Sequence, residues 1–256
     1  MENIANYEYP LNERVRSFLR LEYLLKQINH FLDDTSVWSS RAALASLIEI
    51  QEVVARSDLK TEILKELERH TSSLNKLRQQ SGIDQSRLQE ILNELETLIS
   101  DIYANNRPFG HDLKKNDFLL AIKQRVVIPG GMCDFDLPVY HHWLNNDAEV
   151  RNTMVRDWLA RFELLGHAIH LILKLIREST LHHQEIAEEG IYQKNLDSTT
   201  PCQLVRIALP GDSQYFPEVS GGKHRVNIRF MAYDTIDVKA QQTHDDVVFK
   251  IAYCII

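Results

Sequence analysis

The spacing of the apolar residues changes once along this chain, and that change limits the folds it can adopt. Up to about residue 179 they recur every three or four positions, as in Val15, Phe18 and Leu21, which is the spacing of one helix face. From about Gly190 they alternate with polar residues, as in a strand with one buried face. We therefore expect an α+β protein, with a mainly helical domain over residues 1–186 and a smaller antiparallel β domain over residues 187–256.

Capping and breaking residues divide the helical part into segments. The pattern predicts helices at about 10–32, 39–56, 58–80, 84–102, 116–126, 138–144 and 147–179, the last being the longest. Ser81-Gly82 separates the third helix from the fourth, so these two form a long antiparallel hairpin with charged outer faces.

The β part contains three clear strand patterns, and turn residues stand between them. We expect strands at 204–209, 225–231 and 247–254. Pro210-Gly211-Asp212 and Ser220-Gly221-Gly222 supply the turn chemistry that antiparallel neighbours require.

Composition limits both the cellular compartment and the class of partner. The formal net charge is −7, which argues against bulk binding of nucleic acid. The sequence has no apolar run of about 18 residues and no signal peptide pattern at its start. Its three cysteines are far apart, which suits a reducing cytoplasm. We therefore expect a cytoplasmic protein.

The motifs of common enzymes are missing from the sequence. His167 and His170 share a helix face, but no Cys-x-x-Cys or His-Glu-x-x-His motif accompanies them. Cys133 follows a glycine turn, yet no spacing ties it to a histidine and an acid. We expect no metal, no cofactor and no catalysis.

The run from Ser220 to Met231 combines a glycine turn with an alternating strand that has no acidic residue. Arg225 and Arg229 share one face of this strand, and Lys223 stands in the turn before it. A cationic patch on an acidic chain orients an anionic partner. Basic residues also protect exposed strand edges from aggregation, so at this point both interpretations stay open.

A second group of arginines lies in the first helix. Arg16 and Arg20 are four residues apart and therefore stack on one face. Arg16 has Glu13 as a partner within reach. Arg20 either pairs with a carboxylate of a neighbouring helix or joins the strand arginines in one cationic groove.

Six segments in one order carry the most specific signal. They are Pro10-Leu11-Asn12-Glu13-x-x-Arg16, Lys60-Thr61-Glu62-x-Leu64, Asp84-Gln85-Ser86-Arg87, Ile128-Pro129-Gly130-Gly131-x-Cys133-x-Phe135-Asp136-Leu137-Pro138, Asp212-Ser213-Gln214-x-x-Pro217, and Lys223-x-Arg225-x-x-Ile228-Arg229-Phe230-Met231. In these segments, and over nearly its whole length, the chain resembles the ZapD family of bacterial cell division proteins.

The resemblance implies a non-enzymatic, cytoplasmic homodimer at the mid-cell division site. Such a dimer binds the C-terminal tail of the tubulin-like GTPase FtsZ at two sites. It thereby cross-links FtsZ protofilaments into bundles and stabilises the Z-ring. The residues that the resemblance assigns to tail binding are Arg20, Arg56, His141, Lys223, Arg225, Ile228 and Arg229.

One position departs from the family pattern. The family has an arginine in the short helix before Ile128, and the matching residue here is Asp117, with Lys114 and Lys115 just before it. Either Asp117 alters the edge of the basic patch or the two lysines restore its charge, and at this point both interpretations stay open. The alternative function, from a different class, is a nucleic-acid or nucleotide-binding module that uses the same patch.

Overall fold

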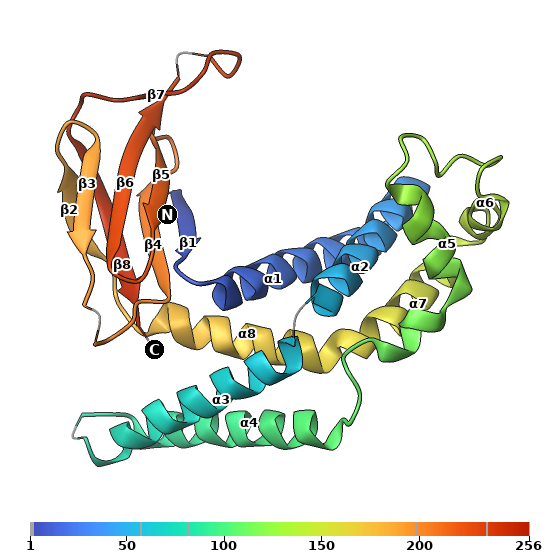
Figure 1. Cartoon of the computed structure of the whole chain (residues 1–256), viewed down its shortest axis with the longest axis horizontal. Coiled ribbons are helices and arrows are strands. Elements are labelled where there is room, and N and C mark those ends of the chain that lie inside the picture. The colour runs from blue at the N-terminus through green and yellow to red at the C-terminus, as the bar shows by residue number, and fades with distance from the viewer. Residues whose placement is uncertain (1–2, 57, 81, 198, 234, 256) are drawn as a thin grey trace. The chain divides into compact units, whose positions relative to one another are not determined.

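The computed structural model describes residues 3–56, 58–80, 82–197, 199–233 and 235–255. It confirms the α+β class, because helices dominate the first part of the chain and antiparallel strands the last (Figure 1). The chain forms two compact units. The β unit comprises Met1–Arg16 and Leu173–Ile256, and the helical unit comprises Ser17–Ile172.

This division differs from the predicted boundary between residues 186 and 187. Strand β1 (Ile4–Pro10) pairs in register with β4 (Leu204–Pro210), which places the N-terminal segment in the β unit. Glu8 of β1 also binds Arg177: its Oε1 and Oε2 accept hydrogen bonds from Nε at 2.8 Å and from Nη2 at 2.7 Å. A bidentate ion pair of this kind fixes the strand against the end of the last helix.

The helices follow the predicted order, with one correction. They are α1 (Glu13–Leu32), α2 (Val37–Arg56), α3 (Leu59–Asn75), α4 (Gln85–Ala104), α5 (Asp117–Val126), α6 (Pro138–Leu144), α7 (Ala148–Leu159) and α8 (Glu163–Glu178), with 3₁₀ turns η1 (Lys76–Gln79), η2 (His111–Lys115) and η3 (Ala160–Phe162). The single helix predicted over 147–179 is wrong, because η3 separates α7 from α8. At this break the Phe162 ring occupies the space that a Cβ at Gly110 would need, and Gly110 has a φ of +62°.

The predicted helical hairpin is confirmed. Helices α3 and α4 lie side by side in Figure 1. Asp84 caps α4 as expected, since its carboxylate accepts a hydrogen bond from the Arg87 backbone N–H at 3.0 Å. Asp58, the expected cap of α3, makes no side-chain capping bond. The seam between the helices contains fully buried apolar side chains, including Ile63, Leu67, Leu92, Leu95 and Ile102.

A buried arginine holds the start of α2 to α7. Arg151 is 4% exposed, and its Nε donates to Ser40 Oγ at 3.0 Å. Its Nη2 donates to the Thr35 carbonyl at 2.9 Å, and its Nη1 donates to the carbonyls of Leu144 and Asn146. The charge is thus met by oxygen atoms of α2, of the end of α6 and of the adjoining loops, which gives this arginine a structural role.

The β unit is a pair of antiparallel sheets. One has the order β1-β4-β8-β2 and adds β8 (Val247–Cys254) and β2 (His183–Ala187) to the strands named above. The other has the order β3-β6-β5, formed by β3 (Ile191–Asn195), β6 (Arg225–Ala232) and β5 (Phe216–Gly221). The short β7 (Gln241–Gln242) also pairs with β6. The three predicted strands correspond to β4, β6 and β8, whereas the pattern missed the others.

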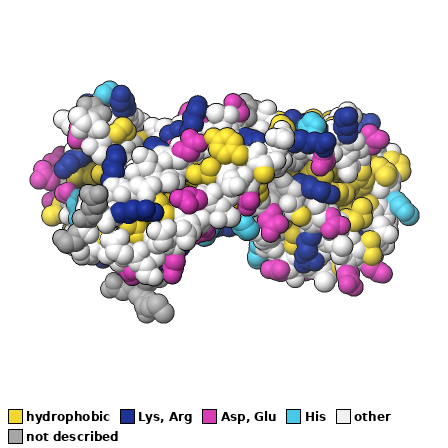
Figure 2. Space-filling view, turned by 90° about the horizontal axis from the view of Figure 1, so that it is seen from below, with side chains coloured by type: hydrophobic (Ala, Val, Ile, Leu, Met, Phe, Trp, Pro, Cys, Tyr) yellow, Lys and Arg dark blue, Asp and Glu magenta, His cyan; other side chains and the backbone are white. Residues whose placement is uncertain are grey.

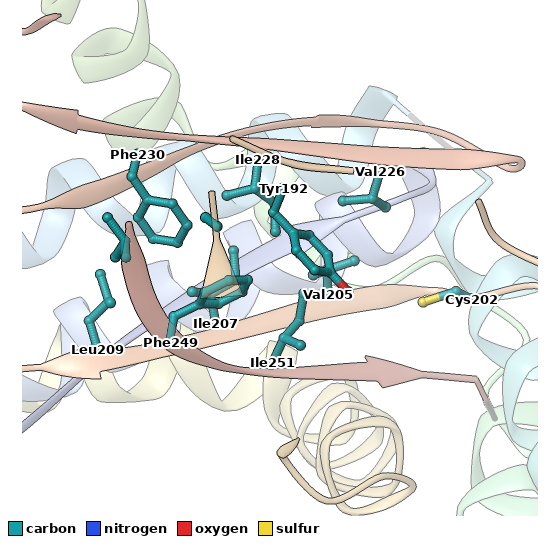
Figure 3. Packing of buried hydrophobic residues seen from close by; sticks show 12 residues of the cluster. Tyr192, Cys202, Val205, Ile207, Leu209, Val226, Ile228, Phe230, Phe249 and Ile251 are labelled. Carbon is teal, nitrogen blue, oxygen red and sulfur yellow. The ribbon is translucent and has the colours of Figure 1, made fainter. Parts of the chain in front are cut away.

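Apolar side chains of the two sheets meet in one core (Figure 3). Phe230 of β6 and Phe249 of β8 have ring centroids 4.9 Å apart, and Tyr192 of β3 meets Phe249 edge-on at 5.2 Å. The core also contains Val205, Ile207, Val226, Ile228 and Ile251, each 0% exposed. Because β6 faces this core with every second residue, its remaining residues face outward.

Candidate functional site

The alternation predicted for β6 is confirmed. Val226, Ile228 and Phe230 are each 0% exposed, whereas Arg225 and Arg229 are exposed. The same geometry corrects one candidate contact. Ile228 lies inside the sheet pair (Figure 3), so its side chain offers no surface to a ligand and supports the core instead.

The partners of β6 define the rest of its outer face. Arg229 lies opposite Ile191 of β3 and Glu218 of β5. Arg225 lies opposite Asn195, at the end of β3. The outer face therefore combines two arginines with amides, one carboxylate and an isoleucine that is 48% exposed. We call Lys223, Arg225 and Arg229 the sheet patch.

The three cations of the sheet patch differ in how they are paired. Arg229 Nη2 lies 3.1 Å from Oε2 of Glu218, and both side chains are at least half exposed. The side chains of Lys223 and Arg225 make no hydrogen bond or ion pair with any residue that the structure describes. The patch thus retains two available cations and one that an internal carboxylate shares.

A tight turn holds Lys223 beside the strand. The backbone N–H of Gly222 donates to the carbonyl of Arg225 at 3.0 Å, which closes the turn. A Cβ at Gly221 would lie 3.1 Å from Leu11 and 3.2 Å from Val226. The small residue at this position therefore lets β5 approach β6 closely.

The remaining candidates belong to the helical unit. Arg20 of α1 is exposed and forms no hydrogen bond or ion pair within the described ranges. Arg56 ends α2, and its side chain lies outside the described part of the structure. His141 is an exposed residue of α6. The expected pair between Arg16 and Glu13 is present, with 2.6 Å between Nη1 and Oε1.

His141 lines a groove of about 460 Å³ that sequence reasoning missed. Trp38 and Arg41 of α2 line it too, together with Ile128 and Cys133 from the segment between α5 and α6. Arg41 lies over the rings of Trp38 and Tyr140, with its Cζ 5.0 Å and 5.2 Å from their centroids. Sequence reasoning missed this groove because its clearest marker is the exposure of Trp38, and a sequence does not show which side chains are exposed.

Burial raises the pKa values of several side chains in both units. Burial raises the pKa of Tyr140 to about 12, and the nearby Arg41 charge partly offsets this effect. Burial likewise raises the pKa of Cys202 to about 12 and that of Cys254 to about 11. These two thiols are therefore poor nucleophiles, whereas Cys133 is exposed.

The histidines and acids examined as metal ligands do not converge. His167 and His170 line a groove of about 480 Å³ together with Glu22 and Glu163. Among the described residues, no group of three or more histidine, cysteine or carboxylate side chains has the arrangement that a metal ion needs. Within the same ranges, no helix has the length and apolar character required to cross a membrane.

The departure at Asp117 lies at the surface. Asp117 is the first residue of α5 and is exposed, as are Lys114 and Lys115 in η2. On the face shown in Figure 2, basic and acidic side chains are interspersed rather than gathered into one basic region. Local clusters such as the sheet patch, and not the overall charge, are therefore the features that would select an anionic partner.

Comparison with known proteins identifies the family. The profile of the family described as "ZapD: Cell division protein" matches residues 19–229. Cell division protein ZapD of Methylococcus capsulatus is 41% identical over 256 residues, covering 100% of both chains. The ZapD of Chromobacterium violaceum is 36% identical, covering 98% of this chain and 99% of its own. The chain therefore belongs to the ZapD family of cell division proteins.

Proposed function

We propose that this protein binds the C-terminal tail of FtsZ and, as a homodimer at the mid-cell division site in the cytoplasm, cross-links FtsZ protofilaments into bundles. The observation that carries the proposal is an exposed pair of cations, Lys223 and Arg225, without internal partners in the described chain of a ZapD family member. The function requires no cofactor and no catalytic step.

The chemistry of the sheet patch suits a short peptide that is both acidic and apolar. A guanidinium such as that of Arg225 binds a carboxylate through two parallel charge-assisted hydrogen bonds. Apolar contacts come from the same face, where Ile191 is 48% exposed opposite Arg229. The half-buried Phe216, whose ring centroid lies 5.8 Å from that of Tyr233, extends this apolar surface.

Bundling follows from weak binding at two sites. A flexible tail loses conformational freedom when it binds, so a single site has modest affinity. A dimer that holds two tails gains avidity, because the second binding event is intramolecular. In this proposal Arg20, Arg56 and His141 of the helical unit add further contacts.

Co-sedimentation with FtsZ filaments tests the proposal. The Arg225→Glu/Arg229→Glu variant should fail to pellet with filaments and should bind a fluorescent FtsZ tail peptide at least ten times more weakly. Arg87→Glu is the matched control, since Arg87 is an exposed arginine of α4 paired only weakly, at 3.2 Å, with Glu90. Undiminished pelleting of the double variant with an unchanged circular dichroism spectrum would remove the sheet patch from the function.

Two further measurements separate the proposal from its competitors. Light scattering at micromolar concentration should give the mass of a dimer, and a monomer mass would rule out cross-linking by two tail sites. A gel-shift assay tests the nucleic-acid alternative. Binding of nucleic acid that the Arg225→Glu/Arg229→Glu variant abolishes, without any binding of FtsZ, would favour that alternative.

A further inference from the structure

The guanidinium of Arg41 lies over two aromatic rings of the helical unit. Its Cζ lies 5.0 Å from the ring centroid of Trp38 and 5.2 Å from that of Tyr140. Its Nε is buried and has no hydrogen-bond partner. The structure gives this side chain no hydrogen bond or ion pair with any described residue. Arg41 is therefore a positioned cation whose N–H groups are not used inside the protein.

The other cations near the segment that joins α5 to α6 are already paired. Lys123 Nζ lies 3.7 Å from Oε1 of Glu52, and Arg125 Nη1 lies 3.8 Å from Oδ1 of Asp136. Arg41 differs because aromatic rings, and not a carboxylate, hold its guanidinium. Stacking reduces the freedom of the side chain and leaves the edge of the guanidinium available to a carboxylate.

Apolar side chains surround this cation. The groove of about 460 Å³ that contains Arg41 is also lined by Trp38, Val126 and Ile128, which are 76%, 40% and 45% exposed. Exposed apolar side chains gathered around a groove are characteristic of a surface that binds a partner. An occupant therefore needs a carboxylate for Arg41 and an apolar side chain for this rim.

Two titratable side chains in the groove affect its charge. Asp134 lines the groove, and its own carboxylate accepts a hydrogen bond from the Phe135 N–H at 3.0 Å. His141 lines it as well and is exposed. The carboxylate of Asp134 would repel a ligand with several negative charges. A single carboxylate beside an apolar side chain therefore fits the groove better than a phosphate or a run of acids.

We propose that this groove is a peptide-binding site that recognises one carboxylate next to a large apolar side chain, with Arg41 binding the carboxylate. Trp38 and Ile128 bind the apolar side chain. This groove and the sheet patch have no residue in common. Because His141 is one of the contacts proposed for the FtsZ tail, this inference extends the proposed function to a second binding element on the helical unit.

Fluorescence polarisation on the full chain tests the recognition directly. The probes are a fluorescein-labelled peptide with an amidated C-terminus that contains one glutamate next to a leucine and no other acidic residue, and a matched peptide with glutamine in place of that glutamate. We expect the glutamate peptide to bind at least ten times more tightly than the glutamine peptide. Arg41→Gln should remove that difference, whereas the control Arg87→Gln should preserve it.

The same titration distinguishes the groove from the sheet patch. If Arg225→Glu/Arg229→Glu abolished binding of the glutamate peptide and Arg41→Gln had no effect, the inference would be overturned and the proposed function would stand. If wild-type protein failed to pellet with FtsZ but still bound the glutamate peptide through Arg41, the proposed function would fail and the groove would remain.

A second readout does not depend on the stability of the Arg41 variant. Cys133 lines the groove and is exposed, so a bound peptide should slow its alkylation by iodoacetamide at least threefold. Trp38→Ala should reduce peptide binding about tenfold without lowering the unfolding midpoint, because Trp38 is 76% exposed. Equal alkylation rates with and without saturating peptide would show that the peptide binds elsewhere, which would overturn the inference.

Discussion

Arg229 donates a hydrogen bond from Nη2 to Oε2 of Glu218, 3.1 Å away on the neighbouring strand β5. Both side chains are at least half exposed, so this pair contributes about 0–1 kcal/mol to stability. The greater effect falls on binding. An anionic ligand that binds Arg229 must displace the carboxylate of Glu218 from its guanidinium. Glu218 therefore lowers the affinity of the sheet patch for such a ligand.

Removing this carboxylate should strengthen binding. Glu218→Gln leaves the strand pairing intact but frees Arg229, so affinity for the FtsZ tail peptide should rise about twofold to fivefold. Fluorescence polarisation with a labelled tail measures this change. Glu90→Gln, which removes the matching partner of Arg87 on α4, should leave the affinity unchanged. Equal affinity for Glu218→Gln and wild type would show that Arg229 makes no contact with the tail.

Loss of the buried arginine should destabilise the protein. Arg151→Met leaves Ser40 Oγ and the Thr35 carbonyl without their donor, so the free energy of unfolding should fall by about 3 kcal/mol. Urea denaturation at a fixed protein concentration measures this fall. Arg87→Met on the surface of α4 is the control and should change stability by less than about 0.5 kcal/mol. A loss of similar size in both variants would contradict the structural role of Arg151.

The stability of the β unit should depend on His182. Burial, followed by the charges of Arg206 and Lys250, lowers the pKa of His182 below its usual value of 6.5. The unfolded state then binds the proton at a higher pH than the folded state does. The free energy of unfolding therefore decreases as pH falls from 6.5 through the lower folded pKa.

A substitution tests this linkage. The melting temperature of His182→Gln should fall less between about pH 7.5 and about pH 5.5 than that of wild type. His224→Gln is the control in the same unit: this histidine is exposed and is not among the groups that shift the pKa of His182, so its substitution should preserve the wild-type fall. If His182→Gln lost as much stability as wild type, other groups would account for the acid sensitivity.

The thiols should react in two classes. Cys133 is exposed, whereas burial raises the pKa of Cys202 to about 12 and that of Cys254 to about 11. A thiol-reactive dye at pH 8 should therefore label the folded protein once, and Cys133→Ser should abolish this labelling. Denaturant should expose the other two thiols to the dye. Rapid labelling of folded Cys133→Ser would contradict the burial of the remaining cysteines.

The sequence predicted much of the fold, because its strongest patterns act locally. Asp84 caps α4, and the alternation around Arg225 gives β6 its two faces. One of the strands that were missed depends on a distant partner. Strand β1 forms through its pairing with β4, and local periodicity does not reveal a partner about two hundred residues away.

The candidate site was predictable only in part. Charge and alternation identified Arg225 and Arg229, but no pattern indicated that Glu218 would lie opposite Arg229, because that depends on strand register. The groove at Arg41 was missed for a similar reason. Tyr140 reaches it from a helix about a hundred residues further along the chain.

The pairing of β1 with β4 also bears on how the chain folds during synthesis. Residues 4–10 are translated long before residues 204–210, the strand that completes their hydrogen bonds. The helical unit is continuous in sequence and is fully translated before β4, so it can fold on the nascent chain before β1 pairs with β4. Strand β1 is thus the edge of a sheet that closes late, because the other strands of that sheet, β2, β4 and β8, are translated after the helical unit.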